Sequence, residues 1–216
     1  MKKNAETDWK ILNVGITGGI GSGKTTVCSI FETLGIPIYS TDERAKEIVV
    51  EDEELKEKMK ALFGKEAYLE DGALNRAYIS NIVFQNKTKD SNPKLEALNA
   101  IIHPAIWRDG ERWFKAQKNV PYTLKESALL FESGGYKLLD KVITVFAPQE
   151  VRINRVILRG GITTKREEVE ARMNQQMPDE EKIKLADFVI YNDGKQALIP
   201  QVMKIHNSLS IDLAAR

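Results

Sequence analysis

The most restrictive feature of the sequence is the glycine-rich segment at residues 18–25, which reads Gly-Gly-Ile-Gly-Ser-Gly-Lys-Thr. It fits the pattern Gly-x-x-x-x-Gly-Lys-Thr, whose glycines let successive backbone N–H groups converge on phosphate groups. An apolar run at residues 11–17 comes directly before it, and apolar residues at helical spacing follow between Val27 and Leu34. This order places the N–H groups at a helix start, where the helix dipole favours negative charge. The segment therefore predicts a nucleotide site within an α/β fold.

Strand and helix signals alternate along most of the chain. Further strand signals occur in four short apolar runs, at residues 36–39, 122–126, 142–146 and 188–191. Helical spacing of apolar residues lies between or after these runs, at residues 44–50, 150–158, 165–176 and 197–205. Such alternation predicts an α/β domain with a parallel sheet.

Residues 53–117 break this alternation, because strand signals vanish there and helical patterns take over. We interpret the segment as a helical insertion between two strands of the core. Within it His103 precedes Pro104, and the residue before a proline is disfavoured in helical backbone. We therefore expect one helix to end at His103 and another to begin at Pro104. Further upstream, Thr41 and Asp42 are expected to form a loop before the next helix.

Composition narrows the functional classes. The chain has 216 residues, enough for one sizeable core with an embellishment. Its 32 Lys and Arg residues against 31 Asp and Glu residues give a net charge of +1, which disfavours a dedicated nucleic-acid coat. No apolar run approaches the roughly 18 residues that a membrane-spanning helix needs. We therefore expect neither nucleic acid nor membrane as a partner.

Two features bear on the cellular compartment. The N-terminal stretch contains Glu6 and Asp8 where an export signal needs an apolar run. The single cysteine, Cys28, cannot form an internal disulfide, which is usual in a reducing compartment. We expect Cys28 to be a small buried hydrophobe. The prediction is a cytoplasmic protein that is a monomer or a small homo-oligomer.

The chemistry of the nucleotide site depends on its last two residues. Lys24 would place a positive charge beside the β- and γ-phosphates, and the Thr25 hydroxyl would join the coordination shell of Mg²⁺. A guanine-specific protein needs Asn-Lys-x-Asp, whereas the nearest match, at residues 86–90, reads Asn-Lys-Thr-Lys-Asp and lies in the helical insertion. We therefore expect ATP with Mg²⁺.

Two carboxylates near this site each have two interpretations. Asp42 follows the second strand, at the sheet edge where nucleotides bind in parallel α/β folds. It would either accept the proton of an attacking hydroxyl group or cap the following helix, and position alone does not separate these roles. Glu126 ends the third strand and would either orient a magnesium-bound water or be a solvated strand end.

Arginines cluster after the fourth strand. Arg152, Arg155 and Arg159 are spaced by three and four residues, which places them on one helix face. A solvated basic face is one interpretation. The other is a mobile lid, with Arg166 and Arg172 further along, that brings positive charge over a transferring phosphoryl group.

The two histidines carry less information. His103 lies at the expected helix junction, where it would either bind substrate or pack against its neighbours. His206 lies in the C-terminal helix, away from every motif, and is expected at the surface.

An ordered series of motifs resembles the dephospho-coenzyme A kinase family over almost the whole chain, from about residue 11 to residue 209. The glycine-rich segment alone is shared by many families, whereas the ordered set is far more specific. The series comprises residues 17–26, Leu98-Asn99, residues 103–106 (His-Pro-Ala-Ile), residues 129–132 (Leu-Leu-Phe-Glu), Arg155, Arg159, Arg172, Gln176 and residues 186–192.

The resemblance implies ATP-dependent phosphorylation of the ribose 3′-hydroxyl of dephospho-coenzyme A, the last step of coenzyme A synthesis. It also implies a P-loop NTPase-type three-layer fold with a parallel sheet. Its parts would be a nucleotide-binding core at residues 11–52, 119–147 and 186–210, a helical substrate-binding domain at residues 53–118 and a helical lid at residues 148–185. Another small-molecule kinase of this fold, such as a nucleoside monophosphate kinase, is the alternative.

The resemblance further implies roles for individual residues. Asp42 matches the family's proposed catalytic base, while Lys24 and Arg155 would stabilise charge on the phosphoryl group. Asp42, Asn99 and His103 would contact the acceptor, and Thr25 the metal. ATP would be bound by Gly19, Gly21, Ser22, Gly23, Lys24, Thr25, Thr26, Arg159 and Asn192.

Five positions depart from the family's pattern, among them Thr41 for an alanine and Ala128 for a proline, and the other three bear on the site. Ser40 replaces the first aspartate of an Asp-Ala-Asp segment, which leaves Asp42 as its one carboxylate. Lys46 replaces an arginine, and lysine cannot form the forked contact that arginine makes. Glu126 replaces an aspartate and preserves its charge.

Overall fold

The computed structural model describes residues 11–85, 92–161 and 164–214. The N-terminal stretch and the near-match to a guanine motif at residues 86–90 lie outside these ranges. The chain divides into two compact units. We call Met1–Ser40 with Gln117–Arg216 the core unit, and Thr41–Ala116 the helical unit.

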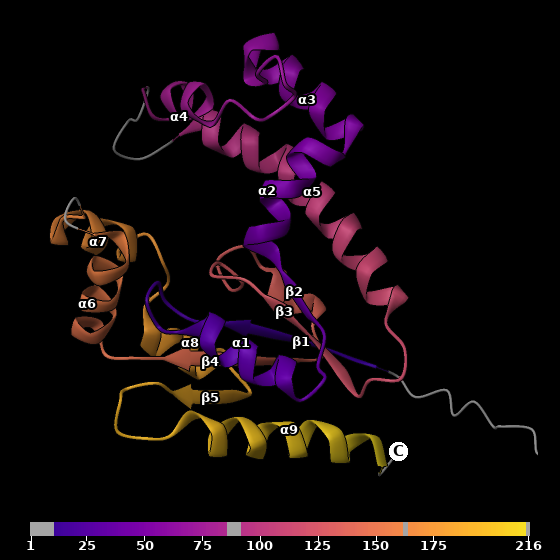
Figure 1. Ribbon diagram of the computed structural model, residues 1–216, viewed down its shortest axis with the longest axis vertical. Helices are drawn as coiled ribbons and strands as arrows, with labels where there is room; N and C mark the ends of the chain where they lie inside the picture. Colours follow the sequence, from indigo (N-terminus) through magenta and orange to yellow (C-terminus); the bar gives the residue numbers. More distant parts are fainter. Residues whose placement is uncertain (1–10, 86–91, 162–163, 215–216) are drawn as a thin grey trace, which may run out of the picture. The chain divides into compact units, whose positions relative to one another are not determined.

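Within the described ranges, the core unit is built on a parallel sheet of five strands, which confirms the predicted fold class (Figure 1). The strands lie in the order β2-β3-β1-β4-β5. Because parallel strands point the same way, the segments that follow them leave from one edge of the sheet. The strands are β1 (Leu12–Thr17), β2 (Ile38–Ser40), β3 (Tyr122–Glu126), β4 (Lys141–Phe146) and β5 (Phe188–Tyr191).

Helices α1 (Lys24–Thr33) and α9 (Leu198–Ala214) pack on one face of the sheet. Phe31 of α1 and Val202 of α9 are fully buried in one cluster with apolar side chains of the strands. Successive strand residues face opposite sides, so Gly15 of β1 lies on the other face. There a Cβ would lie 2.6 Å from the side chains of Leu130 and Leu139, which border the short 3₁₀ helix η2 (Gly135–Leu138). Segments on both faces therefore make the three layers.

Helices α6 (Gln149–Gly160), α7 (Arg166–Met173) and α8 (Asp179–Leu185) lie between β4 and β5. Ile153 of α6 packs with Val169 and Met173 of α7, and Ile20 of the glycine-rich segment packs against this cluster. The sequence pattern predicts α6 and α7 but not α8. The seven residues of α8 read Asp-Glu-Glu-Lys-Ile-Lys-Leu, which is too short and too polar for a periodic signal.

The helical unit confirms the predicted helical insertion. It contains α2 (Thr41–Glu51), α3 (Glu53–Phe63), the 3₁₀ helix η1 (Lys65–Ala67), α4 (Arg76–Gln85) and α5 (Pro93–Ala116). Leu55, Met59 and Phe63 form the buried stripe of α3, and α2 and α3 both pack against α5. The unit begins at Thr41, whereas the sequence reading places the start of the substrate domain at residue 53. The functional roles of these ranges stay predictions.

Two local predictions in this unit are wrong. α5 runs unbroken from Pro93 to Ala116 with Pro104 inside it, so no helix ends at His103. A proline in a helix interior costs about 3 kcal/mol, and packing of α5 against α2, α3 and α4, with Ala105 and Ile106 buried, outweighs that cost. Asp42 lies in the first turn of α2 rather than in a loop before it.

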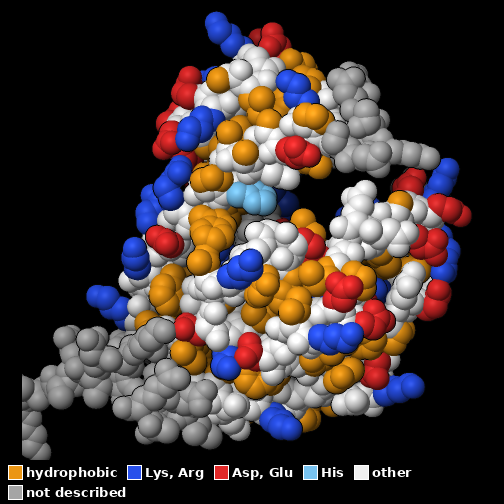
Figure 2. Space-filling view, turned by 180° about the vertical axis from the view of Figure 1, so that it is seen from behind, with side chains coloured by type: hydrophobic (Ala, Val, Ile, Leu, Met, Phe, Trp, Pro, Cys, Tyr) orange, Lys and Arg blue, Asp and Glu red, His pale blue; other side chains and the backbone are white. Residues whose placement is uncertain are grey.

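The surface is mixed in charge. On the described part of the face in Figure 2, Lys and Arg side chains are interspersed with Asp and Glu side chains. None of the helices in the described ranges combines the length and apolar character needed to cross a bilayer. The 24-residue α5 is long enough but carries charged side chains along its length.

Candidate active site

The glycine-rich segment joins β1 to α1 in a backbone conformation that glycine adopts most easily. Gly18, Gly21 and Gly23 have φ angles of 151°, 79° and 93°, a region that disfavours residues with a Cβ. Neighbouring groups also approach closely. A Cβ on Gly21 would lie 2.6 Å from the carbonyl oxygen of Arg152, and one on Gly23 would overlap the side chain of Asn192. The loop therefore requires glycine for both its conformation and its packing.

Helix α1 begins at Lys24 without a side-chain cap and without an acidic residue in its first turn. Gly23 occupies the N-cap position, where it offers no side-chain acceptor to the first N–H groups. Thr25 and Thr26 are exposed in the same turn. The positive end of this helix is therefore open to an anion from outside the chain.

Two polar side chains lie beside this helix start. Nζ of Lys24 donates a hydrogen bond to the carbonyl oxygen of Gly18 over 2.9 Å. The hydroxyl of Ser22 is buried and has no hydrogen-bond partner among the residues that the structure describes. An unsatisfied buried hydroxyl costs about 1–3 kcal/mol. A phosphate oxygen would supply the missing partner.

Arg155 and Asn192 hold the loop at Ser22. Asn192 follows β5, and its Nδ2 donates to the carbonyl oxygen of Ser22 over 2.8 Å. Arg155 of α6 donates to the same carbonyl oxygen over 3.4 Å and to the carbonyl oxygen of Asn192 over 3.0 Å. The structure thus brings together three segments that lie far apart in the sequence.

Arg152 is not part of a solvated basic face, so that interpretation is wrong for this residue. It is 7% exposed, pairs with Asp179 of α8 over 2.5 Å, and donates from Nε to the carbonyl oxygen of Ala147 over 3.1 Å. Burial raises the pKa of Asp179, although the guanidinium of Arg152 opposes that rise. The sequence pattern missed α8 and therefore missed the carboxylate that accounts for the inward position of Arg152.

Side chains from the segment after β4 also hold the backbone of Ile20. The N–H of Ile20 donates to Oε1 of Gln176 over 2.8 Å, and its carbonyl oxygen accepts from Arg152 over 3.4 Å. Sequence reasoning named Gln176 only through the family resemblance. No local pattern signals this bond, because its partners are separated by 156 positions in the chain.

The remaining arginines of the predicted lid lie at the surface. Arg166 pairs with Glu150 over 2.5 Å and with Glu170 over 2.7 Å. Arg159 and Arg172 are exposed. The structure therefore brings Arg155 to the glycine-rich loop and leaves Arg159 outside that set of contacts.

Two departures from the family's pattern contact each other. Oγ of Ser40, at the end of β2, donates to Oε2 of Glu126, at the end of β3, over 2.9 Å. Glu126 is half-buried, so it is not a solvated strand end. Cys28 is buried as predicted, and burial, assisted by the charge of Glu126, raises its pKa to about 12.

The predicted acceptor residues all lie in the helical unit. Asp42 is exposed, and its side chain forms no hydrogen bond or ion pair with any residue that the structure describes, so it does not cap α2. Asn99 and His103 are exposed on α5, four positions apart and therefore on one face. Lys46 pairs with Glu43 over 2.6 Å.

His206 is not a surface residue, contrary to expectation. It is half-buried, and its Nδ1 lies 2.8 Å from the hydroxyl oxygen of Tyr122. Tyr122 is fully buried in β3, so His206 provides a hydrogen-bond partner for a phenol that would otherwise have none in the core. Its place is structural and lies in the packing between β3 and α9.

The fold and the glycine-rich loop together define the class of protein. A parallel sheet with strand order β2-β3-β1-β4-β5, whose first strand leads through a glycine-rich loop into an uncapped helix, is a P-loop nucleotide-binding fold. The structure of a dephospho-CoA kinase from Campylobacter jejuni matches with a TM-score of 0.65 and 29% identity, covering 93% of this chain and 98% of that one.

Comparison of the sequence with known proteins identifies the family more specifically than the fold does. A dephospho-CoA kinase from Bacteroides fragilis is 36% identical over 194 residues, which cover 90% of this chain and 91% of the relative. One from Chlorobaculum tepidum is 38% identical over 207 residues, with 92% and 95% covered. The family model described as dephospho-CoA kinase matches residues 12–197. The chain belongs to the dephospho-CoA kinase family, which confirms the resemblance.

Proposed function

We propose that this protein transfers the γ-phosphoryl group of ATP to the ribose 3′-hydroxyl of dephospho-coenzyme A, giving coenzyme A and ADP. The observation that carries the donor half is the start of α1, where positive-φ glycines, an open helix N-terminus and Lys24 form a phosphate cradle. Membership of the dephospho-CoA kinase family supports the acceptor half. The protein would act in the cytoplasm, as a monomer or a small homo-oligomer.

ATP is assigned to the glycine-rich loop and its neighbours. The N–H groups of the loop and of the first turn of α1 would bind phosphate oxygens, and the unsatisfied Ser22 hydroxyl would gain a partner. Lys24 and Arg155 would stabilise charge that develops on the phosphoryl group. The residues assigned to ATP are Gly19, Gly21, Ser22, Gly23, Lys24, Thr25, Thr26, Arg159 and Asn192.

The residues near Lys24 also fit Mg²⁺. Thr25 exposes its hydroxyl at the start of α1, beside the phosphate cradle, and Glu126 holds a half-buried carboxylate at the same edge of the sheet. Oxygen donors of this kind suit Mg²⁺, which usually keeps phosphates and waters among its ligands. The bound ion would neutralise charge on the β- and γ-phosphates.

Asp42 is assigned as the general base. It is exposed and has no partner among the described residues, as a base awaiting substrate requires. It follows Ser40 by two positions, and Ser40 ends β2 at the edge of the sheet from which the glycine-rich loop also leaves. Asp42 would accept the proton of the 3′-hydroxyl as that oxygen attacks the γ-phosphorus.

The helical unit is assigned to the acceptor, with Asn99 and His103 on α5 as contacts for dephospho-coenzyme A. The segment at residues 148–185 is assigned as the lid. Its arginines at 155 and 159 would bring positive charge to the triphosphate, and its Gln176 already contacts the loop through Ile20.

Mass analysis of the acceptor after incubation with ATP and Mg²⁺ tests this function. Dephospho-coenzyme A should gain one phosphoryl group. Coenzyme A, whose 3′ position already carries phosphate, is the matched control and should remain unchanged. AMP tests for a nucleoside monophosphate kinase. Transfer to AMP without transfer to dephospho-coenzyme A would overturn the proposal.

A further inference from the structure

The first turn of α2, which carries Asp42, lacks a side-chain cap of its own. Asp42 is exposed and unbonded, and the Oγ1 of Thr41 is buried without a hydrogen-bond partner among the described residues. The first N–H groups of any helix lack intrahelical partners, so an uncapped first turn frays easily. A contact with another helix of the same unit would therefore stabilise this turn.

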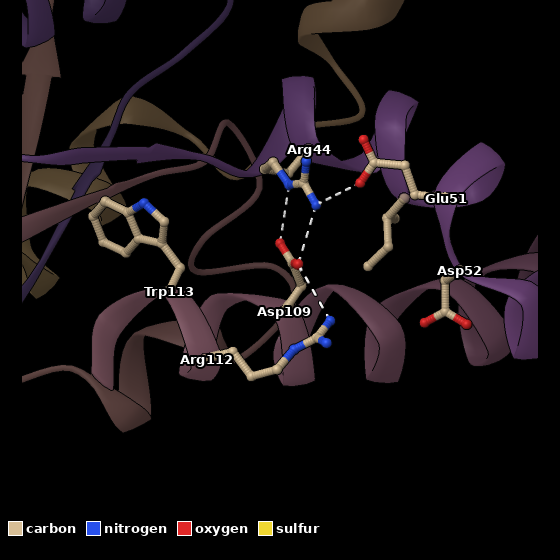
Figure 3. A pocket seen from close by; sticks show the side chains of 7 residues that line it. Arg44, Glu51, Asp52, Asp109, Arg112 and Trp113 are labelled. Atoms are coloured by element: carbon tan, nitrogen blue, oxygen red, sulfur yellow. Dashed lines mark hydrogen bonds and ion pairs between the residues drawn. The ribbon is translucent and has the colours of Figure 1, made fainter. Parts of the chain in front are cut away.

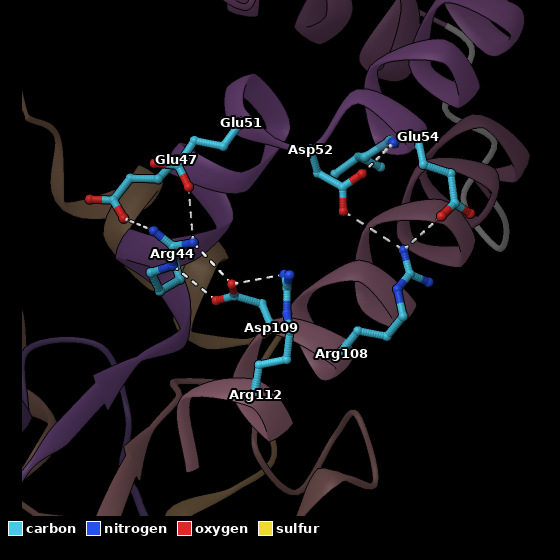
Figure 4. Close-up of polar contacts among 9 residues, drawn as sticks. Arg44, Glu47, Glu51, Asp52, Glu54, Arg108, Asp109 and Arg112 are labelled. Atoms are coloured by element: carbon cyan, nitrogen blue, oxygen red, sulfur yellow. Dashed lines mark hydrogen bonds and ion pairs between the residues drawn. The ribbon is translucent and has the colours of Figure 1, made fainter. Parts of the chain in front are cut away.

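Arg44 makes that connection. Its Nε donates to Oδ2 of Asp109 over 3.0 Å and its Nη2 to Oδ1 over 3.1 Å, a forked pair with α5 (Figure 4). Nη1 donates to Glu47 over 2.6 Å, and Nη2 also donates to Glu51 over 3.0 Å. Forked pairs of this kind fix orientation as well as distance. We call the Arg44–Asp109 pair the α2–α5 clamp.

The clamp leaves little of Arg44 for a substrate. Four of the five N–H groups of a guanidinium are used by the three carboxylates. These contacts, above all the hydrogen bond to Asp109, raise the pKa of Arg44 above its ordinary value. One N–H group of Nη1 is left for a phosphate of the acceptor, too few for a forked contact. Arg44 therefore holds α2 rather than binding substrate.

A cavity lies beside the clamp. The clamp borders an open cavity of about 790 Å³, whose lining also includes Ile48 and Trp113 (Figure 3). Beside this cavity, the forked ion pair joins α2 directly to α5. Arg44 and Asp42 are two positions apart, about 200° around the helix at 100° per residue. The clamp thus holds α2 from the side opposite Asp42.

We propose that Arg44 is a positioning residue for the phosphoryl transfer. Its pair with Asp109 fixes the turn that carries Asp42 on the helix that carries Asn99 and His103. The inference rests on the proposed function, because it gives the base and the acceptor contacts one shared frame. Loss of the clamp would leave ATP binding intact and would lower the rate at which a bound acceptor reacts.

Steady-state kinetics of four variants tests the proposal: Arg44→Gln, Arg44→Lys, Asp109→Asn and the double variant Arg44→Gln/Asp109→Asn. We expect Arg44→Gln and Asp109→Asn each to lower kcat by about 10- to 100-fold, the size of effect that a small misplacement of a catalytic group produces. KM for ATP should stay within about 2-fold, since the clamp contacts no group assigned to ATP. Arg44→Lys should lie between, because lysine keeps the charge but not the fork. The double variant should be no slower than either single one.

Arg112→Gln is the matched control. Arg112 lies 3.5 Å from the same Asp109 oxygen, but it belongs to α5 and its side chain is 73% exposed, so its loss leaves α2 held. Normal kcat in folded Arg44→Gln would overturn the inference. A raised KM for dephospho-coenzyme A with unchanged kcat would assign Arg44 to substrate binding instead and would also overturn it.

Hydrogen exchange separates this inference from the proposed function. Amides in the first two turns of α2 should exchange faster in Arg44→Gln than in wild type, and at the wild-type rate in Arg112→Gln. If wild type transfers no phosphate to dephospho-coenzyme A, the proposed function fails by itself. The exchange comparison still tests whether the clamp holds α2, because equal exchange rates in the two variants would overturn that inference.

Discussion

The N-terminus of α1 in the core unit and that of α3 in the helical unit differ in whether a side chain of the protein caps them. Helix α1 begins with Gly23 and Lys24 and has no acidic side chain in its first turn. Helix α3 follows Asp52, whose carboxylate accepts a hydrogen bond from the N–H of Leu55 over 3.0 Å, and two glutamates come next. The chain satisfies the start of α3 with its own side chains and leaves the start of α1 to an external anion.

Helix α2 shows that an acidic first turn is not always a cap. Asp42 is the same residue type as Asp52 and also stands at a helix start, but it bonds to no described residue. The difference teaches that the hydrogen bond, rather than the residue type, separates a structural aspartate from one available for chemistry.

The largest expected effect comes from Asp42→Asn. If Asp42 is the base, turnover should fall by a factor on the order of 10² to 10⁴, because the amide cannot accept the proton. The free energy of unfolding should change little, since no hydrogen bond is lost. The neighbouring Glu43→Gln is the control and should retain activity. Near-normal turnover in folded Asp42→Asn would show that Asp42 is not the general base.

Lys24→Ala should lower the rate of phosphoryl transfer by about 10² to 10³, the loss seen when one preorganised electrostatic contact to a transition state is removed. Lys56→Ala is the matched control on α3, where that lysine pairs with Glu53 over 2.6 Å. Equal activity in the two variants would show that the open start of α1 is not the donor site.

Gly23→Ala should destabilise the fold by about 2–3 kcal/mol, measured by urea unfolding. About 1–2 kcal/mol arises from the positive φ, and the rest from overlap with Asn192. Gly35→Ala isolates the first contribution, because Gly35 has φ 79° at the other end of α1 and an added methyl group there would meet no atom within 4 Å. Equal losses in the two variants would show that Asn192 does not press on the loop.

The buried side of α1 predicts a pH effect. The pKa of Cys28 is about 12 in the folded state against about 9 when unfolded, so the folded state keeps the proton that the unfolded state loses. Stability should therefore fall as pH rises, by about 1.4 kcal/mol between pH 8 and pH 10. Cys28→Ala should lack this component. The same pH dependence of unfolding in both proteins would contradict a buried thiol.

The smallest effect is expected at the capped helix. Asp52→Ala should cost about 1 kcal/mol of stability, the usual value of an N-cap. Turnover and the stabilisation by ATP should both remain, because the start of α3 is not assigned to any ligand. A loss of ATP binding in Asp52→Ala would contradict the assignment of ATP to the N-terminus of α1 and not to that of α3.

Much of the fold could be predicted because its signals are local. The strand, loop and helix at residues 11–34 and the later apolar runs reflect a period and a motif that short stretches contain. Pro104 shows where such reasoning fails, because a local preference against helix was overridden by packing around α5. Helix α8 was missed because its seven residues, five of them charged, are too few to show a period.

Some residues of the candidate site could likewise be predicted from the sequence, and others could not. Lys24, Thr25 and the glycines could be found because their spacing along the chain is itself the motif. The contacts of Arg155 with Asn192 and of Ser40 with Glu126 could not, since each joins residues far apart in sequence. Arg152 and Arg155 both donate to the loop, yet Arg152 is buried against Asp179 and bonds to Ile20, whereas Arg155 bonds to Ser22 and Asn192.

By itself, the sequence determined the α/β class, the phosphate loop and the family, because these depend on residue types at fixed short spacings. Only the tertiary structure decided which helix starts are capped, which arginines contact the loop and how α2 is held on α5. Those outcomes depend on which side chains, distant in sequence, the fold places next to each charged or polar group. Burial raises the free-energy cost of leaving such a group unpaired, so the pairing affects stability.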